Sequence, residues 1–161
     1  DMVSTSDGGR YTAGQGVIYS IPYLERFGLA LVVARNSKAT SLQDFAGKRV
    51  GISAGNSHAR EYLAHHLPDA TIVELPEGRY WLADAIGSGK VDAIVHDSIL
   101  AKHRVRATGL RIPVFWLEGS SAQYRFAFRT ENIFLRGETD KAIRKVLASE
   151  EYNKLIEDYL P

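Results

Sequence analysis

Residues 85–98 read AIGSGKVDAIVHDS, and their pattern indicates the class of fold. A helical pattern ends at its Gly87-Ser88-Gly89 run, because glycine readily adopts the backbone conformation that closes a helix. The apolar segment from Val91 to Asp97 is typical of a buried strand, and a further helix is predicted from Ser98 to about Ala107. A helix, a strand and a helix in this order indicate an α/β domain.

The same alternation continues on both sides of this stretch. The further predicted strands are residues 27–34, 49–53, 70–75, 114–117 and 124–128. The further predicted helices are residues 41–45, 58–66, 80–86 and 139–159, the last with a break near Ser149. The apolar run 27–34 suits a strand buried on both faces. Strands and helices at this spacing predict an α/β fold with mainly parallel sheets.

The composition of the whole chain excludes several classes of function. Its 161 residues are 45% hydrophobic, which is enough for a sizeable core. Twenty basic residues against nineteen acidic ones give a net charge of +1, so we expect no nucleic-acid partner. The absence of cysteine excludes disulfides and thiolate metal sites. The apolar run 27–34 is too short to span a bilayer, and no secretory signal is visible at Asp1.

The turn Gly55-Asn56-Ser57 is the first candidate site, because it follows a predicted strand and begins a helix. A helix N-terminus offers unpaired backbone N–H groups and the positive end of the helix dipole. Such a turn attracts a carboxylate or another small anion. Alternatively, Asn56 or Ser57 only caps the helix, which is a common role for both residue types.

Asp97 is the second candidate, at the carboxyl end of a predicted strand. In parallel α/β sheets, ligands gather beyond the carboxyl ends of the strands. An aspartate at that place can bind a cationic group through charge-assisted hydrogen bonds. The alternative is that Asp97 is only the N-cap of the following helix. The sequence alone leaves both roles open.

Signals of metal binding and catalysis are weak. The five histidines lack the spacing that places two metal ligands on one helical face, so we expect no metal site. Neither a Gly-x-Ser-x-Gly elbow nor a phosphate-binding Walker loop occurs. We therefore expect a protein that binds a ligand without a cofactor and is not an enzyme.

Four segments, taken in order, resemble the extracellular solute-binding proteins that serve ABC importers of polar amino acids. They are residues 31–37, 41–51, 55–57 and 85–98. The resemblance implies a periplasmic-binding-protein-like fold, with two α/β lobes joined by two crossing strands around a cleft. Lobe two would be residues 36–123, and residues 1–35 and 124–161 would form a partial lobe one. Family members carry a substantial stretch before the counterpart of Asp1.

The resemblance also implies binding residues in lobe two. Asp97 matches the aspartate that accepts the ligand's α-ammonium group. Asn56 and Ser57 match the turn whose backbone N–H groups receive the α-carboxylate, and His58 adds a side-chain contact.

Lobe one contributes a second set of residues by the same resemblance. Ser4, Thr5 and Ser6 resemble a strip of hydroxyl side chains that forms hydrogen bonds with the ligand. Arg10 lies three residues before Ala13, the position at which the family carries a carboxylate-binding arginine. Arg10 could substitute for that arginine only if the loop is rearranged.

The function implied by the resemblance is capture of an amino acid or a similar small polar solute in the periplasm or outside the cell. The expected partner is the membrane permease of an ABC importer. Two alternatives share the fold. One is an extracytoplasmic sensor domain of a receptor or histidine kinase, and the other is an enzyme such as a dehydratase or a domain of a lytic transglycosylase.

Overall fold

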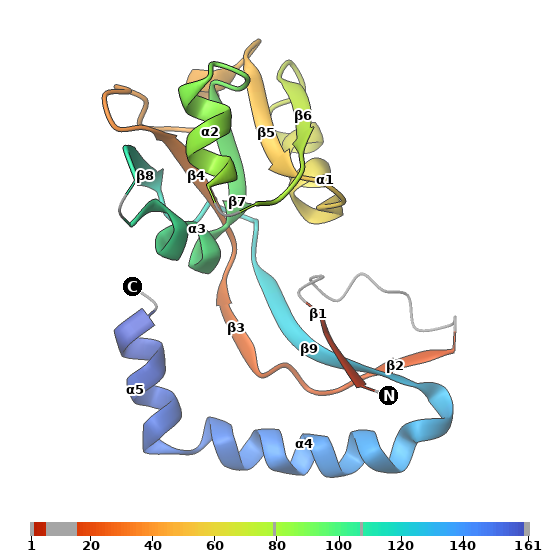
Figure 1. Ribbon diagram of the computed structural model, residues 1–161. Helices are drawn as coiled ribbons and strands as arrows, with labels where there is room; N and C mark the ends of the chain where they lie inside the picture. Colours follow the sequence, from red (N-terminus) through yellow and green to blue (C-terminus); the bar gives the residue numbers. More distant parts are fainter. Residues whose placement is uncertain (1, 6–15, 79, 107, 160–161) are drawn as a thin grey trace. The chain divides into compact units, whose positions relative to one another are not determined.

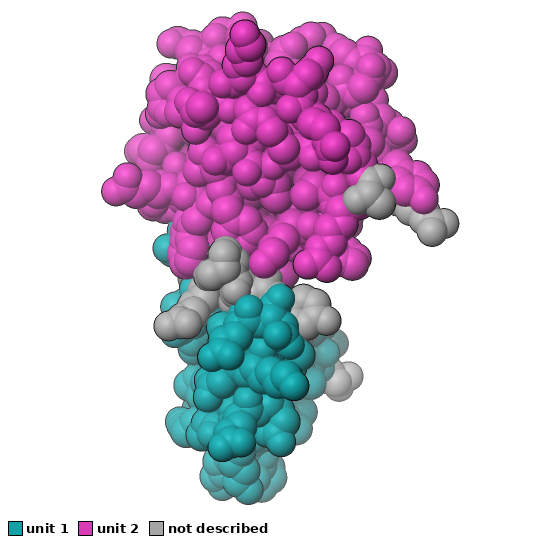
Figure 2. Space-filling view, turned by 90° about the vertical axis from the view of Figure 1, so that its left-hand side faces the viewer, with its two compact units in different colours: residues 1–27, 121–161 teal, residues 28–120 magenta. Residues whose placement is uncertain are grey.

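The computed structural model describes residues 2–5, 16–78, 80–106 and 108–159 (Figure 1). The chain divides into two compact units, which Figure 2 shows in different colours. Unit 1 comprises residues 1–27 and 121–161, and unit 2 comprises residues 28–120. The expected lobe two, residues 36–123, overlaps unit 2. Unit 2 already starts at Gly28, because the strand that begins directly after Gly28 belongs to the sheet of unit 2.

Unit 2 contains a five-stranded sheet with the strand order β6-β5-β7-β4-β8. The strands are β4 (Leu29–Ala34), β5 (Arg49–Ser53), β6 (Thr71–Leu75), β7 (Ala93–Asp97) and β8 (Leu110–Val114). Strand β5 runs parallel to β6 and β7, whereas β4 runs antiparallel to both β7 and β8. The sheet is therefore mixed, and its parallel part contains the strands that precede α1, α2 and α3.

Helices cover both faces of this sheet (Figure 1). They are η1 (Gln43–Phe45), α1 (Ser57–His66), α2 (Trp81–Gly87) and α3 (Ser98–Val105). Leu31 and Val33 of β4 join the core cluster that includes Leu63 of α1. Ala30 and Val32 join the opposite cluster, which includes Leu82 of α2. The prediction that this apolar run is a strand buried on both faces is confirmed.

Unit 1 is built around the long strand β9. Its elements are β1 (Met2–Thr5), β2 (Val17–Tyr19), β3 (Leu24–Phe27), β9 (Ala122–Arg129), η2 (Thr130–Asn132), α4 (Ile133–Leu147) and α5 (Glu150–Tyr159). Strand β9 pairs antiparallel with β1, β2 and β3. The expectation of mainly parallel sheets is therefore wrong for this unit. The chain leaves unit 1 through β3 and returns through β9 in the opposite direction.

Two local predictions also need correction. The strand expected at residues 114–117 lies instead at Leu110–Val114, because the Arg111 guanidinium donates to the carbonyls of Ser37 and Ala39 and fixes this segment beside β4. The C-terminal helical region begins at Ile133, earlier than predicted. Its predicted break is confirmed, since α4 ends at Leu147 and α5 begins at Glu150.

Among the described helices, none is both long and apolar enough to cross a membrane.

Gly28 is buried where the chain enters unit 2. Its N–H donates to the Ser98 hydroxyl at 3.3 Å, and its carbonyl accepts from the Ser98 N–H at 2.8 Å. The next N–H, from Leu29, donates to the Ser120 hydroxyl at 2.8 Å. A Cβ atom at position 28 would lie only 2.6 Å from both the Ser120 Oγ and the Trp116 Nε1. Glycine is therefore the residue that fits at this position.

Replacing Gly28 with alanine is expected to lower the free energy of unfolding by about 1–3 kcal/mol, because the added methyl group forces the buried Ser120 hydroxyl away from its partners. Urea unfolding followed by circular dichroism measures this loss. The matched control is Gly109→Ala, where a Cβ atom meets nothing within 4 Å. We expect the control to change stability by less than about 0.5 kcal/mol. Equal stability of the two variants would contradict the crowding at Gly28.

Candidate functional site

The candidate site lies at one edge of the unit 2 sheet, where three parallel strands end. Strand β5 ends at Ser53, β6 at Leu75 and β7 at Asp97. The parallel register pairs Gly51 with Ile94, so Ser53 lies level with His96. Neighbouring strands are about 4.8 Å apart. The turns that follow β5 and β7 therefore lie side by side at this edge.

The turn after β5 leads directly into α1. Gly55 adopts a φ of +77°, a left-handed conformation that glycine tolerates best. Asn56 is the N-cap, and its Oδ1 accepts from the N–H of Ala59 at 2.9 Å. Its capping role is thus confirmed. Gly55 and Ser57 are exposed, so the turn is accessible to solvent. An anion-binding role for Asn56 and Ser57 stays a prediction.

Asp97 has the corresponding position at the start of α3. Its Oδ1 accepts from the N–H groups of Ile99 and Leu100, at 3.0 and 3.1 Å. The alternative that Asp97 caps this helix is therefore confirmed. The side chain is half-buried and lies at the same sheet edge as the Asn56 turn. Its proposed role towards a ligand ammonium group is compatible with the cap, because a carboxylate accepts several hydrogen bonds.

The remaining predicted residues are distributed over both units. His58 is the second residue of α1 and is half-buried, so the structure brings it to the same edge as Asn56, Ser57 and Asp97. Ser4 and Thr5 lie in β1 of unit 1, paired with Phe126 and Arg125 of β9. Ser6 and Arg10 lie outside the described residues.

A polar cluster at the same edge was not found from the sequence. Glu77 follows β6, and its Oε1 accepts from the Ser53 hydroxyl at 2.5 Å. The Arg104 guanidinium of α3 pairs with the other carboxylate oxygen at 3.0 Å and also donates to the Gly78 carbonyl. The hydrogen bond from Ser53 holds the pKa of Glu77 below its ordinary value; the positive charge of Arg104 adds to this and burial opposes it. Glu77 is therefore ionised at neutral pH.

His96 borders this cluster inside the protein. It is only 2% exposed, and its ring meets Trp81 edge-on with 5.3 Å between the ring centroids. Within the described part of the chain, neither ring nitrogen of His96 nor the Trp81 Nε1 has a hydrogen-bond partner. Burial lowers the pKa of His96 from 6.5 to about 4; Arg104 adds to the shift and Glu77 opposes it. The imidazole is therefore neutral at pH 7.

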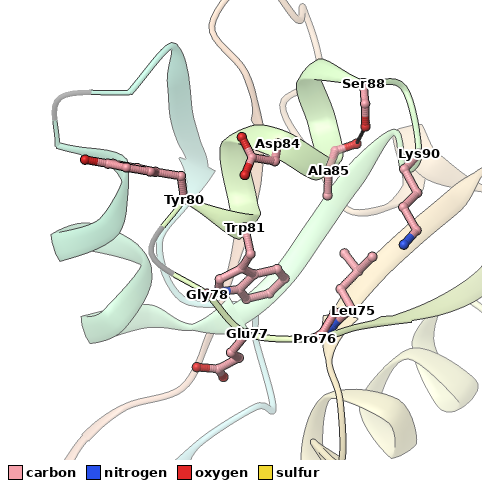
Figure 3. A pocket seen from close by; sticks show the side chains of 10 residues that line it. All are labelled: Leu75, Pro76, Glu77, Gly78, Tyr80, Trp81, Asp84, Ala85, Ser88 and Lys90. Atoms are coloured by element: carbon pink, nitrogen blue, oxygen red, sulfur yellow. Dashed lines mark hydrogen bonds between the residues drawn. The ribbon is translucent and has the colours of Figure 1, made fainter.

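A pocket of about 410 Å³ lies beside the cluster, along α2 and the end of β6 (Figure 3). Its lining residues are Leu75, Pro76, Glu77, Gly78, Tyr80, Trp81, Asp84, Ala85, Ser88 and Lys90. In Figure 3 the Glu77 carboxylate points away from Asp84 and Lys90. It binds instead to Ser53 and Arg104, which do not line the pocket. The pocket and the polar cluster are therefore neighbouring features. The described residues contain no group of three side chains that could hold a metal ion.

Comparisons with known proteins agree with this architecture. A family model described as "NMT1/THI5 like" matches residues 11–150. The ABC transporter arginine-binding protein 1 of Escherichia coli K12 is 23% identical over 150 residues, which is 90% of this chain. An amino acid ABC transporter substrate-binding protein of Streptococcus pneumoniae, solved bound to L-arginine, is 30% identical with a TM-score of 0.75. That match covers 99% of this chain and 67% of the other.

A further solved structure shares the fold alone. The periplasmic VFT2 domain of BvgS from Bordetella pertussis is 21% identical, with a TM-score of 0.77 over 98% of this chain and 65% of that one. The chain spans 60% of the length of the curated Escherichia coli relative. The predicted periplasmic-binding-protein-like α/β fold is confirmed. The family match over residues 11–150 shows that the chain belongs to the NMT1/THI5-like family, and the 30% identity to the streptococcal protein shows that it is related to the substrate-binding proteins of amino acid ABC transporters.

Proposed function

We propose that this chain is the ligand-binding component of an amino acid importer and holds a zwitterion at the carboxyl edge of the unit 2 sheet. One observation carries the proposal: two helix N-termini lie on neighbouring strand ends, one beginning at the exposed Asn56 turn and the other capped by Asp97. The first offers backbone N–H groups to a carboxylate. The second offers a carboxylate to an ammonium group.

Each candidate residue has a defined role in this proposal. The Asn56-Ser57 turn receives the α-carboxylate of the ligand, and His58 contributes a side-chain contact. Asp97 accepts the α-ammonium group. The resemblance alone adds Ser4, Thr5, Ser6 and Arg10 of unit 1 as further proposed ligand-binding residues.

The protein would act outside the cytoplasm, in the periplasm or beyond it, and deliver its ligand to the permease of an ABC importer. It would bind its ligand without changing it chemically. L-arginine is the first ligand to test, because the streptococcal relative is bound to L-arginine and the Escherichia coli relative is named as an arginine-binding protein.

The variant Asp97→Asn tests the proposal by titration calorimetry with L-arginine. Asparagine caps helices as well as aspartate does, so α3 should be preserved while the charge is lost. A charge-assisted hydrogen bond is worth about 1.5–3 kcal/mol, so we expect the Kd to rise roughly tenfold to hundredfold. The control Asp69→Asn removes an exposed carboxylate beyond the opposite end of α1 and should bind like the wild type.

The possible outcomes distinguish a wrong role for Asp97 from a wrong function for the protein. If Asp97→Asn binds L-arginine as tightly as the control, then Asp97 does not hold the ammonium group. If the wild-type chain binds none of the common amino acids, the proposed function itself is wrong. Turnover of a bound amino acid into a product would contradict binding without chemistry.

A further inference from the structure

Glu77 lies at the same edge of the unit 2 sheet as both proposed anchors of the zwitterion. Its carboxylate binds the hydroxyl of Ser53, the last residue of β5, and the Asn56 turn begins directly after that residue. Ser53 lies level with His96, which directly precedes Asp97. The Glu77 carboxylate therefore belongs to the same sheet edge as the turn and the aspartate, although it comes from a third strand end.

This carboxylate is held in place and remains accessible. Ser53 binds one of its oxygens, and Arg104 binds the other at 3.0 Å. Arg104 is in turn fixed by the Gly78 carbonyl. Even so, 44% of the Glu77 side chain is exposed to solvent. A carboxylate fixed before the ligand arrives loses little conformational freedom on binding, which favours affinity.

The charges at this edge favour a cationic ligand. Glu77 and Asp97 contribute two negative charges, Arg104 contributes one positive charge, and His96 is neutral at pH 7. The net charge of these four side chains at pH 7 is therefore −1. A zwitterion with a neutral side chain leaves this charge unmatched, whereas a zwitterion with a cationic side chain neutralises it.

The imidazole of His96 is buried beside this ion pair and is neutral at pH 7. A neutral imidazole has one nitrogen that donates and one that accepts a hydrogen bond. Neither nitrogen has a hydrogen-bond partner among the described residues, and the ring is 2% exposed beside Glu77 and Arg104. The buried imidazole therefore adds no charge that would offset the Glu77 carboxylate at pH 7.

We propose that Glu77 is a specificity-determining residue that selects amino acids with a cationic side chain, through an ion pair at the carboxyl edge of the unit 2 sheet. This inference rests on the proposed function, because it needs the zwitterion held by Asp97 and the Asn56 turn. Arg104 and Ser53 act through Glu77 as positioning residues, since they fix the direction of its carboxylate.

The test compares L-arginine with L-citrulline, which has nearly the same shape but an uncharged side chain. Titration calorimetry with the full chain gives the Kd of each ligand for the wild type and for Glu77→Gln. The amide that replaces the carboxylate can still bond to Ser53 or Arg104, so the edge should stay intact. The matched control is Glu74→Gln, which removes a carboxylate on the same chain segment that pairs with Arg60.

We expect the wild type and Glu74→Gln to prefer L-arginine over L-citrulline by roughly tenfold to hundredfold, the value of one charge-assisted contact. Glu77→Gln should lose most of this preference by weakening L-arginine binding, with little change for L-citrulline. The preference should also fall with added salt, because salt screens an accessible ion pair.

Two results would overturn the inference while leaving the proposed function intact. One is a Glu77→Gln variant that keeps the wild-type preference, and the other is a wild type that binds both ligands equally well. If the wild type binds neither these two ligands nor any other amino acid, the proposed function fails, and the role of Glu77 fails with it.

Discussion

Lowering the pH from 7.5 to 5 is expected to reduce the free energy of unfolding by about 2 kcal/mol through one buried imidazole, that of His96. Burial lowers its pKa in the folded protein from 6.5 to about 4, Arg104 adds to this shift, and Glu77 opposes it. The unfolded chain takes up the proton below pH 6.5, whereas the folded chain does not until about pH 4. The contribution of His96 to the free energy of unfolding is therefore fully present above pH 6.5. It is lost as the pH decreases, by about 3 kcal/mol in total.

The measurement is urea unfolding at pH 7.5, 6 and 5 for the wild type and for His96→Phe. Phenylalanine keeps a ring against Trp81 in the buried site but binds no proton. Glu77 contributes little to the loss of stability between pH 7.5 and 5, because its pKa lies below the ordinary value of 4.5. The variant should lose about 2 kcal/mol less than the wild type between pH 7.5 and 5. Parallel pH profiles for the two proteins would show that His96 does not resist protonation in the folded state.

Replacing Leu31 with alanine is expected to lower the free energy of unfolding by about 2–5 kcal/mol. Leu31 is fully buried in β4, between Val95 of β7 and Val114 of β8. Its loss removes apolar contacts and leaves a cavity where the two neighbouring strands prevent collapse. Chemical unfolding followed by circular dichroism gives the change.

The control for this substitution is Leu100→Ala on α3, where the side chain is 40% exposed. It deletes the same atoms and should change stability by roughly 0.5 kcal/mol or less. A similar loss in both variants would mean that β4 is not the centre of the unit 2 core.

Both caps of the candidate site could be predicted from the order of the residues. Asn56 and Asp97 each directly precede a helical pattern, which is the position that N-caps occupy, and the structure confirms both capping roles. Their common location follows from two parallel strands ending at one edge, which the strand–helix alternation already indicated. Their contacts with a ligand stay predictions, because a cap and an anchor require the same residue types at this position.

The polar cluster could not be predicted in the same way. Glu77 lies 24 residues from Ser53 and 27 residues from Arg104, and the sequence does not state the order of strands in a sheet. The local signal was Glu77 itself, a charged residue two positions beyond a predicted strand. The direction of each strand could not be predicted either, because an apolar run such as β4 can pair in parallel or antiparallel with similar burial.

The misplaced strand at residues 114–117 has a physical cause as well. Its aromatic residues favour a strand, since such residues pack well on a pleated surface. In the structure, Trp116 stays 41% exposed and Phe115 lies under the ammonium group of Lys102, 5.8 Å from it. The two aromatic rings therefore lie outside the sheet, whereas the neighbouring Arg111 fixes β8.

The hydrogen bond between the Leu29 N–H and the Ser120 hydroxyl brings the two ends of residues 28–120 together. A stretch of chain whose two ends are close together and that has its own core has the geometry of an inserted domain. We therefore expect that a short linker can replace residues 28–120, or that this segment can be inserted into a loop of another host, without strain in either backbone.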